Sequence, residues 1–104
     1  MTKYYNIKTA IDSKEIANEI TKSLLEKRLV SSVQQKEISS SYWWNNQIET
    51  SQEYLLEMKT KESLYKEVEQ EIRKLHSYEV PEIFAEEIKE NLNEYLQWIE
   101  KETK

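Results

Sequence analysis

The chain has 104 residues, of which 34% are charged, and its formal net charge is −5. It contains no cysteine, which excludes disulfides, thiolate metal sites and cysteine nucleophiles. It contains no glycine either, which excludes the glycine-rich loops that bind phosphate. Lysine and glutamate are mixed along an acidic chain that has no basic stripe and no run of about 18 apolar residues. We therefore expect one cytoplasmic domain over residues 1–104 that binds neither nucleic acid nor membrane.

The beginning of the chain predicts one strand and one helix. Residues 3–9 show the alternation typical of a short strand. Asp12 followed by Glu15 predicts a capping box at the start of a helix, and apolar residues then recur at helical spacing. The helix is expected to end near residues 27–28, where two positive charges suit its C-terminal dipole.

Residues 29–44 and 47–59 predict two long strands. Asn45 and Asn46 between them predict a two-residue hairpin turn, because asparagine tolerates positive φ better than most residues. An unbroken first strand would measure roughly 50 Å, at about 3.3 Å per residue. A globule of this chain length is only about 33 Å across. The hairpin is therefore expected either to bend back on its own core or to project beyond the body.

A projecting hairpin would expose an aromatic tip. Each ring there can bury about 150–250 Å² of surface, and monomers rarely leave so large an apolar patch exposed. Neighbouring subunits could cover this surface, which favours an oligomer. The predicted interface anchors are Tyr42, Trp43 and Trp44.

The second half of the chain predicts helix, strand and helix. Pro81 blocks continuation of the first of these helices, and residues 82–88 predict a strand. A final helix is expected from Asn91, with Glu94 capping it and Leu92 facing inward. The order β-α-β-β-α-β followed by a helix is typical of the ferredoxin-like α+β fold, with an antiparallel sheet and, here, a long β-hairpin.

Five segments in a fixed order cover nearly the whole chain. They are Arg28–Val33, Ser41–Trp44, Lys59–Thr60, His76–Ile83 and Tyr95–Ile99. In this order and spacing they resemble the CutA family of divalent-cation tolerance proteins. The resemblance implies a tight homotrimer of ferredoxin-like subunits, similar in fold to the PII signalling proteins, in which hairpin arms continue sheets across subunits. It also implies a role in tolerance to copper and other divalent cations.

The resemblance implies a polar pocket between subunits, formed by Lys59, Tyr78, Glu82 and Trp98. The chain departs from the family pattern in three places. Ser32 stands where a cysteine is common, and serine cannot offer the thiolate that Cu(I) prefers. His76-Ser77-Tyr78 replaces the common His-Pro-Tyr, and Asn46 replaces the hairpin glycine.

His76, the only histidine, is the main candidate metal ligand. Together with Glu79 it could bind a harder ion such as Zn²⁺ or Cu²⁺, so a divalent metal is the one possible cofactor. Alternatively, His76 is a cation at the end of the second helix, where it would suit the helix dipole. Catalysis is not expected, because the nearby carboxylates lack a nucleophile or a tuned base. Glu82 is expected instead to pair with Lys59 on an adjacent strand.

Three functions remain open at this point. The leading hypothesis is a trimeric CutA-like protein linked to divalent-cation tolerance, which acts by binding ions or a partner. The first alternative is a PII-like sensor that binds a small metabolite between subunits, near Lys59 and Glu82. The second alternative is a purely structural scaffold.

Overall fold

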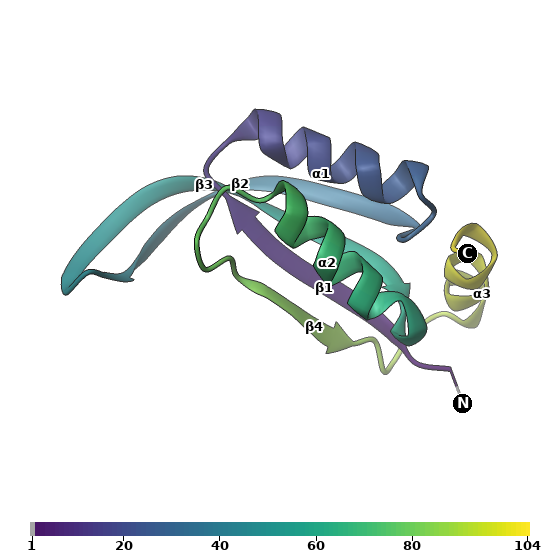
Figure 1. The fold of residues 1–104 in the computed structure, drawn as a ribbon. Coiled ribbons are helices and arrows are strands. Elements are labelled where there is room, and N and C mark those ends of the chain that lie inside the picture. The colour runs from purple at the N-terminus through teal and green to yellow at the C-terminus, as the bar shows by residue number, and fades with distance from the viewer. Residues whose placement is uncertain (1) are drawn as a thin grey trace.

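The computed structural model describes residues 2–104, and that range contains four strands and three α-helices (Figure 1). In chain order the elements are β1 (Tyr4–Ile11), α1 (Lys14–Glu26), β2 (Ser32–Trp44), β3 (Gln47–Lys61), the 3-10 helix η1 (Glu62–Leu64), α2 (Tyr65–Leu75), β4 (Ile83–Glu87) and α3 (Asn93–Glu102). This is the predicted β-α-β-β-α-β order followed by a helix. The ferredoxin-like α+β fold is therefore confirmed.

The strands form one antiparallel sheet in the order β2-β3-β1-β4. α1 and α2 cover one face of this sheet, while α3 lies at the end of the sheet where β1 begins (Figure 1). There, Tyr4 and Lys61 both bind Glu100 of α3, at 2.9 Å each. We call the face opposite α1 and α2 the open face.

The alternation of the strands decides which side chains form the core. Ile7 of β1 lies opposite Met58 of β3, and both are fully buried beneath the helices. The next pair, Lys8 and Glu57, points to the open face because successive side chains of a strand alternate. The helices complete the core with residues at helical spacing, namely Ala17, Ile20 and Leu24 of α1 and Val68 and Ile72 of α2.

The cap of α1 differs from the prediction. Ser13, not Asp12, is the N-cap residue: its backbone is extended, and its Oγ accepts a hydrogen bond from the Ile16 amide at 3.2 Å. Asp12 is exposed. The reason is that β1 continues to Ile11, so the helix begins one residue later than the capping-box pattern indicated.

The start of α3 also differs from the prediction. The helix begins at Asn93 and has no side-chain cap. Asn91 bonds instead to the Lys89 carbonyl at 2.9 Å. Leu92, expected to face inward, is 66% exposed, because it precedes the helix and does not share its buried side.

The hairpin of β2 and β3 projects beyond the body, as Figure 1 shows, and the molecule measures 44 × 27 × 21 Å. The pairing runs without a bulge from Ser32 opposite Lys59 to Trp44 opposite Gln47. Both turn residues have positive φ, 51° at Asn45 and 63° at Asn46, as a two-residue type I′ turn requires. The predicted turn is confirmed, and the alternative of an arm folded back on its own core is wrong.

The first arm is shorter than predicted, because β2 begins at Ser32 rather than at Leu29. Arg28 has a φ of 58°, and the Leu29 amide donates to the Leu24 carbonyl at 3.0 Å, which closes the end of α1. Leu29 and Val30 are buried in the core directly after this turn. None of the helices within residues 2–104 combines the length and apolarity that crossing a membrane would require.

Candidate functional site

His76 follows α2 and is almost completely buried. Its Nε2 lies 2.8 Å from the Ala10 carbonyl of β1, and its Nδ1 accepts a hydrogen bond from the Tyr78 amide at 3.2 Å. One ring nitrogen therefore donates and the other accepts, which describes a neutral imidazole. Burial lowers the pKa of His76. The predicted cationic histidine at the helix end is wrong, because this ring joins the end of α2 to β1 as an uncharged group.

Tyr78 connects the segment before β4 to the hairpin. Its hydroxyl donates to Oε2 of Glu53 in β3 at 2.6 Å, and its ring meets the His76 ring edge-on, with centroids 4.7 Å apart. Burial, together with the adjacent Glu53 carboxylate, raises the pKa of Tyr78 strongly. Glu53 is only 6% exposed. Glu53 is not among the predicted site residues, because a glutamate in an alternating strand has the same sequence signal as any solvent-exposed residue.

A groove lies between the hairpin tip and the segment that leads to β4. Its volume is about 730 Å³. Its walls include Tyr42, Trp43 and Trp44 from the hairpin and Tyr78 and Glu82 from the other side. We call it the hairpin groove. It brings the three predicted interface anchors together with two of the four residues of the predicted pocket.

The other two predicted pocket residues lie far from the hairpin groove. Lys59 is six residues from Glu53 along β3, which corresponds to about 20 Å. Its Nζ donates to Gln34 at 3.1 Å, and desolvation by burial lowers the pKa of Lys59. Trp98 of α3 stacks on Tyr95, with ring centroids 6.0 Å apart, and is 40% exposed. A single chain therefore does not bring the four residues together.

The predicted ion pair between Lys59 and Glu82 is wrong. β1 lies between β3 and β4 in the sheet, so these two residues are not on adjacent strands. The cross-strand ion pair on the open face joins Lys8 of β1 to Glu86 of β4 instead, at 2.8 Å. Asn6, which stands opposite both Lys59 and Glu86, donates to Glu57 at 2.9 Å.

The family model of the CutA1 divalent ion tolerance protein matches residues 5–102 of this chain. The chain belongs to the CutA family. A CutA divalent-cation tolerance protein of Thermotoga maritima is 42% identical over 87 residues, which is 84% of this chain and 86% of that protein. A second one, from Pyrococcus horikoshii, is 36% identical over 90 residues, covering 86% and 88% of the two chains.

Solved CutA structures superpose on the chain closely. The crystal structure of CutA1 from Oryza sativa has a TM-score of 0.94 at 30% identity and covers 98% of this chain and 94% of that chain. CutA1 from Pyrococcus horikoshii has a TM-score of 0.91 at 32% identity, with 96% and 98% covered. The ferredoxin-like chain thus has the CutA fold, and the long hairpin is part of it.

The candidate metal ligands of this CutA chain do not form a preassembled site. Both nitrogens of His76 are engaged in hydrogen bonds, and Glu79 is exposed. No group of three or more histidine, aspartate or glutamate side chains gathers to hold a metal ion in the part of the chain that the structure describes. A metal at His76 and Glu79 stays a prediction, and it would require His76 to give up one of its two hydrogen bonds.

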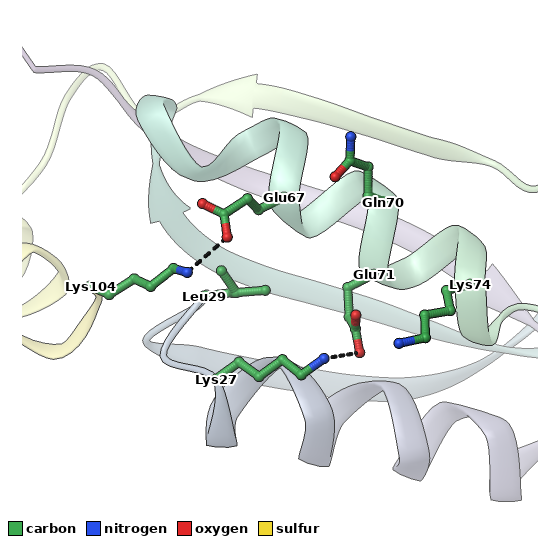
Figure 2. Close-up of a pocket in the computed structure, with 7 residues that line it drawn as sticks. All are labelled: Lys27, Leu29, Glu67, Gln70, Glu71, Lys74 and Lys104. Carbon is green, nitrogen blue, oxygen red and sulfur yellow. Dashed lines mark hydrogen bonds and ion pairs between the residues drawn. The ribbon is translucent and has the colours of Figure 1, made fainter.

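A second cavity, of about 480 Å³, lies between α1, α2 and the C-terminal residues (Figure 2). Three lysines line it, but two of them are already neutralised. Lys27 pairs with Glu71 at 2.9 Å, and Lys104 pairs with Glu67 at 2.8 Å. Figure 2 shows both pairs lying across the cavity. An anion would have to displace these carboxylates, so we do not consider this cavity a binding site.

Proposed function

We propose that this CutA protein is a homotrimer that supports tolerance to divalent cations, copper among them, by binding ions or a partner and without catalysing a reaction. The observation that carries the proposal is the match of the family model over residues 5–102, together with relatives that are named for divalent-cation tolerance. This match favours cation tolerance over a metabolite sensor of the PII type.

The geometry of a single subunit supports an assembly. Tyr78 and Glu82 lie at the hairpin end of the sheet, whereas Lys59 and Trp98 lie toward the α3 end. Residues at opposite ends of one subunit can meet only if the α3 end of one copy contacts the hairpin end of the next. Such head-to-tail contacts form a closed ring when the rotation closes, and three subunits form the smallest such ring beyond a dimer.

Charge and exposure support the same contact. The carboxylate of Glu82 has no ion pair within residues 2–104, and the Lys59 ammonium is bonded only to an uncharged amide. At the hairpin tip, Trp43 is 71% exposed and Ile48 is 66% exposed. Apolar surface of this kind is typical of a protein–protein interface. We propose that a neighbouring subunit covers the tip and brings Lys59 and Trp98 close to Tyr78 and Glu82.

Sedimentation at low micromolar concentration tests the assembly. We expect three times the mass of one chain for the wild type and a clear shift toward monomers for Lys59→Glu, which places like charges in the proposed contact. Glu19→Lys on the exposed side of α1 is the matched control and should leave the mass unchanged. A folded wild-type monomer at this concentration would overturn the trimer.

Isothermal titration with Cu²⁺ and Zn²⁺ tests the role of ions. We expect heat of binding from tag-free wild type and a reduced response from His76→Ala. Because His76 is buried and its replacement can destabilise the fold, Glu79→Gln serves as a second variant at an exposed position. If neither ion releases heat from the wild type, the proposal of direct ion binding is wrong. If both variants bind as the wild type does, the ion binds elsewhere, and His76 and Glu79 are not its ligands.

A further inference from the structure

α3 is attached to the body differently from α1 and α2. Of its residues, all of which the structure describes, Ile99 alone is buried, whereas α1 buries three apolar residues and α2 buries two. Ile99 does not belong to the hydrophobic core that α1 and α2 form over the sheet. Apolar burial therefore contributes less to the docking of α3 than to the docking of the other two helices.

Charged groups make the main polar contacts between α3 and the body. Glu100 accepts hydrogen bonds from the Tyr4 hydroxyl of β1 and the Lys61 ammonium of β3, at 2.9 Å each. Glu102 accepts a hydrogen bond from the Arg28 guanidinium at 2.8 Å. Two carboxylates of α3 thus join the helix to two strands and to the turn that follows α1.

The residues after α3 add a third ion pair, between Lys104 and Glu67 of α2 at 2.8 Å. The side chains of Lys104, Glu67 and Glu100 are about half exposed, and that of Arg28 is more exposed still. Exposed ion pairs are individually weak, and salt screens them, because the Debye length falls from about 10 Å at 0.1 M to about 3 Å at 1 M. The attachment of α3 is therefore sensitive to ionic strength.

The segment before α3 gives the helix freedom to move as a unit. The Ile88 amide still bonds to the Tyr4 carbonyl, at 2.8 Å, but residues 89–92 are exposed. Asn91 bonds to the Lys89 carbonyl of its own segment, and no side chain caps the start of α3. Residues 89–92 can therefore act as a hinge between the sheet and α3.

We propose that α3 is a strap that ionic attraction holds against the body and that rising salt concentration releases, while the sheet, α1 and α2 stay folded. Trp98 moves with this helix. In the trimer proposed above, Trp98 belongs to the contact between subunits, so release of α3 would loosen that contact. This consequence rests on the proposed function, whereas the strap itself is a property of one chain.

Hydrogen exchange followed by mass spectrometry on the full-length wild type tests the strap. We expect the amides of α3 to exchange about tenfold faster in 1 M NaCl than in 0.05 M NaCl, since three exposed ion pairs of ordinary strength together account for a change of this size. The amides of α2 are the internal reference. They should change by less than about twofold, because Val68 and Ile72 hold α2 to the core.

A substitution at Glu100 sharpens the test. Glu100→Gln keeps an acceptor for Tyr4 but removes the charge that holds Lys61, so α3 should exchange about threefold faster in 0.05 M NaCl and respond less to added salt. A negative charge near the C-terminal end of a helix opposes the helix dipole. Its removal alone would stabilise α3, and faster exchange therefore reports the lost contact with the body. The matched control is Glu19→Gln, the same change of charge at an exposed position on α1, which should leave α3 unchanged.

Three outcomes would overturn the strap. If the exchange of α3 does not depend on salt, the apolar contacts of Ile99 suffice to hold the helix. If α2 accelerates as much as α3 does, the whole chain opens together. If Glu19→Gln accelerates the exchange of α3 as much as Glu100→Gln does, the effect comes from net charge alone.

Sedimentation of the wild type at the same salt concentrations tests the consequence for the subunit contact. We expect the trimer to dissociate over the salt range in which α3 is released. A trimer that persists after release would show that the contact does not need a docked Trp98. A wild type that forms no trimer at any salt concentration would refute the proposed assembly, and the exchange rates would still decide whether the strap exists.

Discussion

The two halves of β3 lie in different environments, and the comparison between them shows what makes part of the sheet a core. In its second half, Leu56 and Met58 are fully buried beneath α1 and α2. In its first half, Ile48 is exposed beside the aromatic residues of the tip. Both halves pair with β2 in one uninterrupted ladder. Strand pairing is thus the same in the two regions, and only the helices above the sheet make one of them a core.

The two regions also differ in how their charges are satisfied. Around the body, ion pairs join neighbouring elements, for example Lys27 of α1 to Glu71 of α2. Ser23 donates to the same carboxylate, and together these contacts lower the pKa of Glu71. In the hairpin groove, three carboxylates form no ion pair with the described residues. Within the described residues, the body forms ion pairs between its own elements, whereas the hairpin end leaves Trp43 and Ile48 largely exposed and three carboxylates without an ion pair.

The largest expected effect contrasts a buried and an exposed position of β3. Leu56→Ala should lower the free energy of unfolding by about 3 kcal/mol, because it removes fully buried methyl groups and leaves a cavity. Ile48→Ala should change it by less than about 0.5 kcal/mol. Urea denaturation of both variants, at a concentration where sedimentation finds single chains, measures the two changes. A large loss at Ile48 under these conditions would contradict the contrast.

An intermediate effect is expected where the two regions meet. Tyr78→Phe removes the hydrogen bond to the buried carboxylate of Glu53 and should cost about 2 kcal/mol of stability, as is usual for hydrogen bonds to charged groups. Tyr4→Phe is the matched control, since its hydroxyl binds Glu100 at an exposed site and its loss should cost much less. Urea denaturation of the two variants side by side measures both losses of stability. Equal losses would show that burial of Glu53 does not strengthen its bond.

The smallest effect concerns pH. Because the pKa of His76 is lowered in the folded state, the unfolded chain takes up a proton more readily than the folded one. The free energy of unfolding should therefore fall as the pH falls below about 6.5, the ordinary pKa of histidine, until the folded pKa is reached. Urea midpoints between pH 5 and pH 8 measure this loss. The part of this loss of stability that is due to His76 should be absent in His76→Gln. If the pH dependence of stability is unchanged in that variant, other groups cause the loss.

Much of the local structure could be predicted because it depends on neighbouring residues. The turn at Asn45 and Asn46 follows from their tolerance of positive φ. The position of the N-cap was wrong by one residue, since Asp12 and Ser13 both have suitable side chains. No local sequence signal distinguishes these two residues as N-cap candidates. Ser13 is the N-cap because β1 continues to Ile11.

The candidate site was predictable only in part. The aromatic tip and the pocket residues Tyr78 and Glu82 do lie together in the hairpin groove. The buried partner of Tyr78, Glu53, was missed. The proposed pairing of Lys59 with Glu82 was wrong, because strand order in a sheet is set by contacts between distant parts of the chain.

The sequence by itself determined the order of the elements, the turn of the hairpin and the kinds of site that the absence of cysteine and glycine excludes. These properties follow from periodicity, turn preference and residue chemistry, which act over a few residues. Only the tertiary structure decided that β1 lies between β3 and β4, that His76 is neutral and that Glu53 is buried in an acidic groove. Those properties depend on which distant segments pack together, since burial and long-range contacts set the cost of a charge and the partners it finds.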